Sequence, residues 1–166
     1  MSDANNAIYQ DVVVIAVYMR SAEGISFEEN HEYILEQYRK FLNGCVKIMQ
    51  GNNCCDMILF NNHIYGIYER KYIKTARDLE TTGIGISRLA RDFNCHTEGY
   101  CTEKLLCGIG IATGIAVRIM IRNPFGQSGM WTGGVFEKAY SMAQMSVCDG
   151  IQRVFVDDTA EGNAYR

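Results

Sequence analysis

The chain of 166 residues has one proline, one tryptophan and three histidines, and no dense run of basic residues. It lacks an apolar run of the eighteen or so residues that span a bilayer, and its N-terminus lacks the basic-then-apolar pattern of a secretion signal. Its seven cysteines form no Cys-x-x-Cys pair, which indicates neither a zinc site nor a disulfide framework. These absences predict a protein of the cytoplasm with reduced thiols, no membrane partner and no nucleic-acid partner.

What is present is the composition of one ordinary globular domain. Apolar residues make up 48% of the chain and charged residues 21%, with a formal charge of −3. A chain of this length can bury one substantial core but is short for two domains. The patterning predicts a disordered lead over residues 1–10, one domain over 11–158 and a polar tail over 159–166.

Hydrophobic periodicity predicts alternating strands and helices. Val12 to Met19 is a near-continuous apolar run, typical of a strand covered on both faces. In the first half of the chain we expect a helix from a capping box at Ser26 and Glu29 to Asn43-Gly44, a hairpin of strands 57–60 and 64–68, and a helix over 71–93. A connector over 94–103 leads to strands over 105–113 and 116–121, which Gly114 separates. A glycine loop over 123–129, a helix after Gly134 and a last strand over 152–156 complete the chain.

Four short motifs lie in one stretch from Leu105 to Met145. They are Gly-Ile-Gly-Ile-Ala-Thr-Gly at 108–114, Gly-Gln-Ser-Gly at 126–129, Trp-Thr-Gly at 131–133 and Ala-Tyr-Ser-Met-Ala at 139–143. In order and spacing they resemble the back half of a class III nucleotide cyclase catalytic domain, most of all the small bacterial cyclases that make pyrimidine cyclic nucleotides in anti-phage signalling. The resemblance extends roughly from Val12 to Val156. It implies an α/β (α+β) fold with a ferredoxin-like βαββαβ core, whose mostly antiparallel sheet has flanking helices.

The same resemblance implies positions for the catalytic groups, and this chain differs at each of them. The two aspartates that bind metal ions in the family correspond to Tyr18 and Asn62. The asparagine and arginine of the later helix correspond to Glu137 and Ser141, and the residue that selects the base corresponds to Ile58. Because a phenol and a carboxamide are poor Mg²⁺ ligands, the chain is expected to lack two-metal chemistry, any bound metal and any cofactor.

Other residues remain as candidates for contact with a nucleotide. The loop residues Gly126, Ser128 and Gly129 could hold a phosphate through backbone N–H groups, and Trp131 could stack on a base, although such residues are also common in plain turns and cores. His63 could bind a softer metal with Asn61 or Tyr18, but a single histidine in a turn is more often polar surface.

Three functions follow from these observations. The first is a pseudo-cyclase, a nucleotide-binding or regulatory partner in bacterial cyclic-nucleotide signalling. The second is an active cyclase that converts UTP, CTP, ATP or GTP to a 3′,5′-cyclic monophosphate with Mg²⁺ or Mn²⁺. The third is a structural dimerisation module that binds no nucleotide. Cyclases of this family work as dimers, so the resemblance also implies a homodimer or a heterodimer with a cyclase relative.

Overall fold

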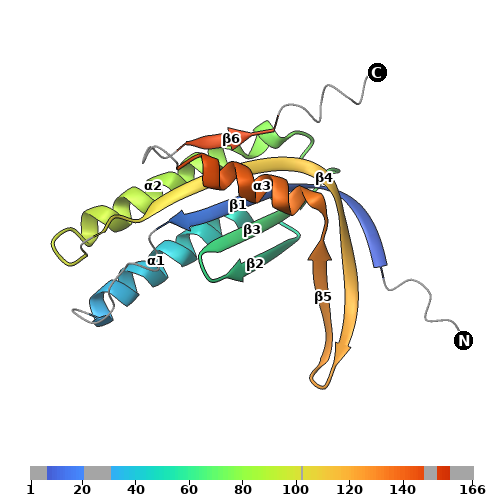
Figure 1. The fold of residues 1–166 in the computed structure, drawn as a ribbon, viewed down its shortest axis with the longest axis horizontal. Coiled ribbons are helices and arrows are strands. Elements are labelled where there is room, and N and C mark those ends of the chain that lie inside the picture. Colours follow the sequence, from blue (N-terminus) through green and yellow to red (C-terminus); the bar gives the residue numbers. More distant parts are fainter. Residues whose placement is uncertain (1–6, 21–30, 102, 148–152, 158–166) are drawn as a thin grey trace, which may run out of the picture.

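A computed structural model of the chain describes residues 7–20, 31–101, 103–147 and 153–157. Within these ranges the chain forms one curved sheet with helices on both faces (Figure 1). The elements are β1 Ala7–Arg20, α1 His31–Gln50, β2 Asp56–Phe60, β3 His63–Glu69, the short 3₁₀ helix η1 Ala76–Leu79, α2 Glu80–His96, β4 Leu106–Asn123, β5 Gly126–Thr132, α3 Gly134–Met145 and β6 Val154–Val156.

The sheet has the strand order β2-β3-β1-β4-β5, and β6 pairs with β4 outside this path. All neighbouring strands are antiparallel except β4 and β6, which are parallel. The prediction of an α+β fold with a mostly antiparallel sheet and flanking helices is therefore confirmed. None of the helices in the described ranges has the length and hydrophobicity that crossing a membrane requires.

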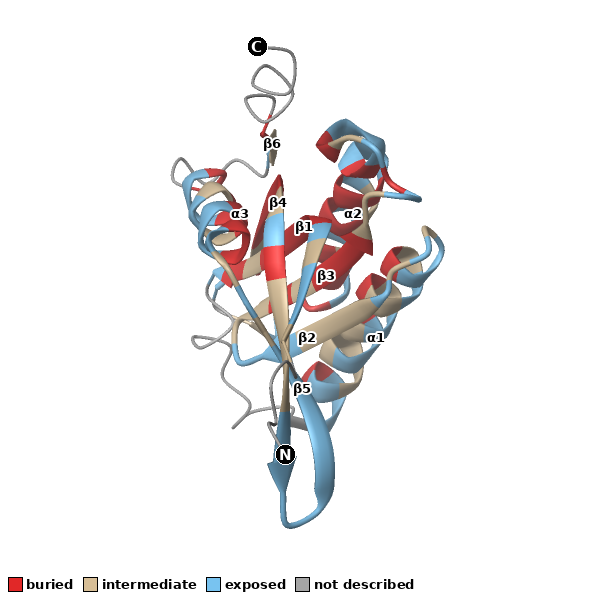
Figure 2. Cartoon of the chain, turned by 90° about the vertical axis from the view of Figure 1, so that its right-hand side faces the viewer, coloured by how far each residue is buried: buried red, intermediate tan, exposed pale blue. Residues whose placement is uncertain are grey.

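Strand β1 is the centre of the core, and both of its faces are covered. Figure 2 shows α3 on one side of the sheet and α1 and α2 on the other. Val13, Ile15 and Val17 pack toward α1 and α2, whereas Val12 and Val14 belong to the cluster beneath α3. Successive side chains of a strand point to opposite faces, so a strand with layers on both sides must be apolar throughout. The prediction of a covered central strand is confirmed.

Helix α3 lies directly on two glycines of β4. A Cβ atom on Gly108 would overlap the carbonyl oxygen of Ala143, and one on Gly110 would overlap that of Ala139. Both alanines are buried on the inner face of α3. The Gly-Ile-Gly-Ile pattern thus has a packing reason: the isoleucines fill the core beneath α1 and α2, while the glycines let a helix backbone approach the sheet.

The structure corrects several predictions in the glycine-rich half. Gly114 does not end a strand, because it pairs with Val12 within the single long strand β4. Residues 123–129 are not a loop, since Asn123 and Gly126 close a hairpin and Gly126, Ser128 and Gly129 lie on β5. The long β4–β5 hairpin projects away from the body of the protein, with an exposed tip (Figures 1 and 2).

Helix and terminal boundaries also differ from the predictions. The disordered lead is wrong for residues 7–10, which pair with β4 as part of β1. Helix α1 continues past Gly44 to Gln50, and Gly44 lies within it against the side chain of Leu89 on α2. The predicted helix from residue 71 starts later, where the Asp78 carboxylate accepts a hydrogen bond from Thr75 N at the start of η1. The proposed capping box, residues 1–6 and the polar tail lie outside the described residues.

Candidate functional site

A hollow of about 370 Å³ lies where β2, β3, β5 and the start of α3 meet. The residues around it are mostly aromatic or aliphatic: Ile58, Leu59, Phe60, His63, Tyr65, Trp131, Thr132, Gly133, Phe136 and Glu137. We call this hollow the aromatic pocket. Glu137 is the only acidic residue among these, and no lysine or arginine belongs to them.

Three of the nine predicted site residues come together at this pocket, and six do not. Ile58, Trp131 and Glu137 line it, from β2, β5 and α3 respectively. Ser141 is exposed one turn further along α3, and the residues once expected to form a phosphate loop lie on β5 outside the pocket lining. The roles of all nine, including Tyr18 and Asn62, remain predictions.

Tyr18 and Asn62 lie side by side next to the pocket, as the resemblance implies for the two metal positions. Tyr18 pairs with His63 across β1 and β3, and the neighbouring Met19 N donates a 2.8 Å hydrogen bond to the carbonyl oxygen of Asn62. The tight turn Asn61-Asn62 forms as predicted, with Asn61 at φ 46°, a conformation that asparagine tolerates.

An aromatic cluster occupies the space beside these two positions. The Tyr18 ring meets Tyr140 of α3 edge-on, with centroids 5.7 Å apart, and His63 lies 5.2 Å from both Tyr140 and Tyr65. Tyr65 in turn meets Phe136 edge-on at 5.5 Å. Such edge-to-face pairs are favourable arrangements of aromatic rings. The described residues contain no group of three or more histidine, cysteine or acidic side chains placed to hold a metal ion.

Two side chains of this cluster, His63 and Tyr65, have shifted pKa values. Burial lowers the pKa of His63, so its imidazole is neutral near pH 7. Burial, together with the charges of Tyr140 and Glu137, raises the pKa of Tyr65. The prediction that His63 is plain polar surface is therefore wrong: it is half-buried among rings. Its ring contacts come from β2, β3 and α3, which no local sequence pattern reveals.

Two cations near the pocket, Lys138 and Arg118, each contact another side chain. Lys138, the residue after Glu137, forms an ion pair with the buried carboxylate of Asp157 beyond β6. The guanidinium of Arg118 on β4 lies over the Trp131 ring, 5.7 Å from its centroid. This contact holds the indole from the β4 side as a cation–π pair. Neither cation is among the residues that line the pocket.

A hydrogen bond joins the two ends of the curved sheet at this pocket. The indole Nε1 of Trp131 on β5 donates to Oδ2 of Asp56 on β2, at 2.8 Å. These strands stand at opposite ends of the order β2-β3-β1-β4-β5, so the sheet must curl to bring them together. No local pattern points to Asp56 as a site residue, because its partner Trp131 is 75 residues away along the chain.

Replacing Asp56 by alanine is expected to lower the free energy of unfolding by about 1.5–3 kcal/mol, the usual contribution of a hydrogen bond to a charged group. Because Trp131 is the only tryptophan in the chain, its fluorescence reports on this bond directly, and the emission should move to longer wavelength as water reaches the indole. Asp92→Ala on the exposed face of α2 is the matched control. An unchanged emission spectrum in Asp56→Ala would contradict the bond.

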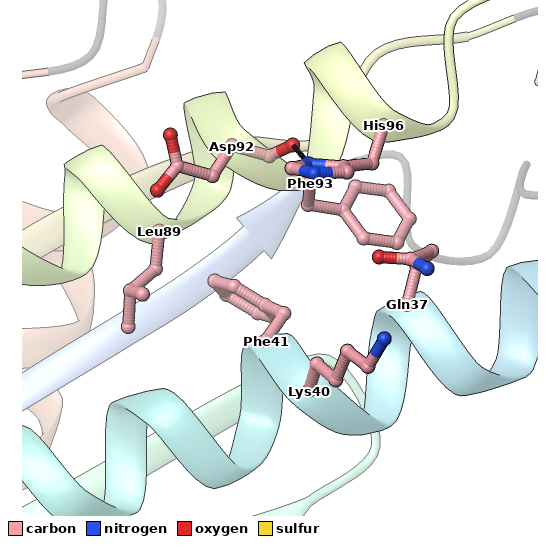
Figure 3. A pocket seen from close by; sticks show the side chains of 7 residues that line it. All are labelled: Gln37, Lys40, Phe41, Leu89, Asp92, Phe93 and His96. Atoms are coloured by element: carbon pink, nitrogen blue, oxygen red, sulfur yellow. Dashed lines mark hydrogen bonds between the residues drawn. The ribbon is translucent and has the colours of Figure 1, made fainter.

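A second hollow lies between α1 and α2, on the other side of the sheet (Figure 3). Its floor is made by Phe41 and Phe93, and its rim carries Lys40, Asp92 and His96. The His96 ring is held against the backbone by a 2.7 Å hydrogen bond between Nδ1 and the carbonyl oxygen of Asp92. None of the residues predicted to act in function line this hollow, so the aromatic pocket is the candidate site.

The structure has the fold of adenylyl and guanylyl cyclase catalytic domains of class III. It is similar to solved structures of the guanylyl cyclase Cya2 (TM-score 0.67, 15% identity, over 84% of this chain and 72% of that one). It is also similar to the adenylyl cyclase CyaB from P. aeruginosa (TM-score 0.69, 14% identity, over 84% of this chain and 74% of that one). A third similar structure is the guanylate cyclase domain of RhGC from Catenaria anguillulae in complex with GTP (TM-score 0.60, 12% identity, over 85% of this chain and 75% of that one). No protein-family model and no curated protein matches the chain. At these identities the similarity shows the fold alone.

Proposed function

We propose that this protein is a pseudo-cyclase: a cyclase-fold protein without two-metal chemistry that acts as a nucleotide-binding or regulatory partner. The observation that carries the proposal is the aromatic cluster of Tyr18, His63, Tyr65 and Tyr140. It stands beside Asn62, where the resemblance implies metal ions. Mg²⁺ requires oxygen ligands, chiefly carboxylates, in octahedral geometry, and this cluster offers phenols, an imidazole and a carboxamide.

The aromatic pocket supports a binding role in place of catalysis. A concave, mostly apolar pocket with a few polar groups, here His63, Thr132 and Glu137, is the common form of a small-molecule site. One neighbour of the same fold is described in complex with GTP, which supports a nucleotide as the class of ligand. The proposal includes a cytoplasmic location and a role in bacterial cyclic-nucleotide signalling of the anti-phage kind, on the resemblance of the 108–143 motifs.

The projecting β4–β5 hairpin supports a protein partner. It carries large apolar side chains in water, among them Phe125, which is 98% exposed, Ile121 and Met130. Exposed apolar groups of this kind are typical of surfaces that bind other proteins. The proposed partner is a second copy of the chain or a cyclase relative.

The proposal predicts no cyclase activity. Purified protein incubated with Mg²⁺ or Mn²⁺ and each of ATP, GTP, CTP and UTP should yield no cyclic monophosphate above a control without protein, because the loss of even one metal anchor cripples two-metal phosphoryl transfer. An active cyclase in the same buffer serves as the positive control. Cyclic product that scales with protein concentration would refute the proposal and revive the active-cyclase alternative.

A further inference from the structure

The aromatic pocket has walls suited to a flat ring and unsuited to phosphate. Phe60, Tyr65, Trp131 and Phe136 supply ring surface from three strands and a helix. The indole N–H of Trp131, a potential donor to phosphate, already donates its hydrogen bond to the Asp56 carboxylate. Stacking on aromatic side chains holds heterocyclic bases without any need for charge.

The electrostatics of the pocket disfavour anions. Its only charged side chain is the Glu137 carboxylate, on the first turn of α3. The first turn of a helix carries a partial positive charge, which attracts anions such as phosphate. Here the Glu137 carboxylate already neutralises that charge. Lys138 is paired with Asp157, which leaves the carboxylate without a neighbouring cation on its own helix turn. A polyphosphate in this pocket would meet a like charge.

The same carboxylate is well placed to accept hydrogen bonds. An ionised carboxylate is an acceptor only, with two oxygens that can receive two parallel N–H groups. The aromatic walls and the carboxylate acceptor together fit a planar heterocycle that stacks between the rings and offers N–H donors on one edge. Phosphate groups add nothing to this arrangement.

We propose that the aromatic pocket binds a nucleoside or free nucleobase through its ring and its N–H edge, and discriminates against the nucleoside triphosphate. The proposal rests on the pseudo-cyclase function and specifies its ligand. An enzyme that acts on nucleoside triphosphates holds the phosphates with metal ions and cations. In this pocket the phosphates would face Glu137, so the nucleoside is preferred over the triphosphate.

Guanosine, uridine and GTP form a matched set of probes for isothermal titration calorimetry without metal ions. Guanosine places two N–H donor groups on one edge, whereas uridine has a single N–H between two carbonyl oxygens that a carboxylate repels. GTP has the same base as guanosine and differs by its phosphates. We expect guanosine to bind at least about tenfold more tightly than either of the others. The difference in affinity between guanosine and GTP should become smaller as added salt screens the repulsion between Glu137 and the phosphates.

The variant Glu137→Gln tests the role of the carboxylate. It keeps the shape of the side chain but removes the charge, so guanosine should bind at least about tenfold more weakly while the gap between guanosine and GTP shrinks. Glu32→Gln, an exposed glutamate of α1 across the sheet, is the matched control and should bind like the unmodified protein. Thermal unfolding of each variant shows that a change in binding is not a failure to fold.

Tighter binding of GTP than of guanosine, equal binding of guanosine and uridine, or no binding of any of the three would each overturn this inference. None of those outcomes tests the pseudo-cyclase function itself, which depends on the absence of cyclic product in the activity assay. Conversely, detection of cyclic product would refute the proposed function whatever the order of these affinities.

Discussion

Replacing Gly110 by alanine is expected to lower the free energy of unfolding by about 3 kcal/mol or to prevent folding. The new Cβ would overlap the carbonyl oxygen of Ala139 and lie 2.6 Å from the backbone nitrogen of Ala143. These are backbone atoms of a helix, so no rotation of a side chain relieves the clash and α3 must move off the sheet. Overpacking of a well-packed core costs about 1–3 kcal/mol, and a rigid obstacle belongs at the upper end.

Urea denaturation of Gly110→Ala and Gly134→Ala measures this effect against a matched control. A Cβ on Gly134, at the start of α3, would meet nothing within 4 Å. Alanine there should be neutral or stabilise the protein by about 0.4–1 kcal/mol, since it restricts the unfolded chain. If Gly110→Ala unfolds at the same urea concentration as the unmodified protein, α3 does not rest on β4 as the structure has it.

Alkaline pH is expected to destabilise the protein strongly, through two buried thiols. Cys45 and Cys107 are 0% exposed, and burial raises the pKa of Cys45 to about 12 and that of Cys107 well above its ordinary value. Above about pH 9 the unfolded chain loses these protons while the native protein keeps them, so stability falls as pH rises. Each thiol contributes about 1.4 kcal/mol per pH unit, which gives a loss of roughly 5 kcal/mol between pH 9 and 11.

The measurement is the free energy of unfolding from urea curves between pH 8 and 11. Cys45→Ala should make the slope of the unfolding free energy against pH less steep by the contribution of one proton, about 1.4 kcal/mol per pH unit. This change in slope is expected even if the cavity left by the substitution lowers stability at every pH. Cys95→Ser alters an exposed thiol at the end of α2 and is the matched control. An identical slope in Cys45→Ala and the unmodified protein would show that this thiol does not titrate with unfolding.

Part of the candidate site was within reach of the sequence because its residues are anchored to predictable elements. The apolar run of β1 and the turn at Asn61-Asn62 have local causes and were predicted, whereas the pairing of β1 with β3, which brings Tyr18 and Asn62 side by side, is a tertiary contact. That Ile58, Trp131 and Glu137 line one pocket is a result of the tertiary structure, since they come from β2, β5 and α3. The ligand of that pocket stays a prediction.

The glycines show where sequence reasoning fails. Gly114, Gly126 and Gly129 predict a turn and a loop because glycine favours irregular backbone, yet all three lie in paired strands. Gly126 has φ 130°, a backbone conformation that favours glycine, but the role of the other two depends on their neighbours in space: Gly114 lies under Val135 and Gly129 leaves room for Arg118. Local propensity describes freedom of the backbone and says nothing about which side chain needs the space.

The sequence by itself determined the covered central strand, the tight turn at Asn61-Asn62 and the alternation of strands and helices in the first half of the chain, since each depends on residue type and short-range periodicity. Only the tertiary structure decided that the sheet curls until Trp131 reaches Asp56, and that Tyr18, His63, Tyr65 and Tyr140 form one cluster. These contacts join residues up to 122 positions apart along the chain (140 − 18). Their geometry comes from how β1, β3 and α3 pack, which no local pattern encodes.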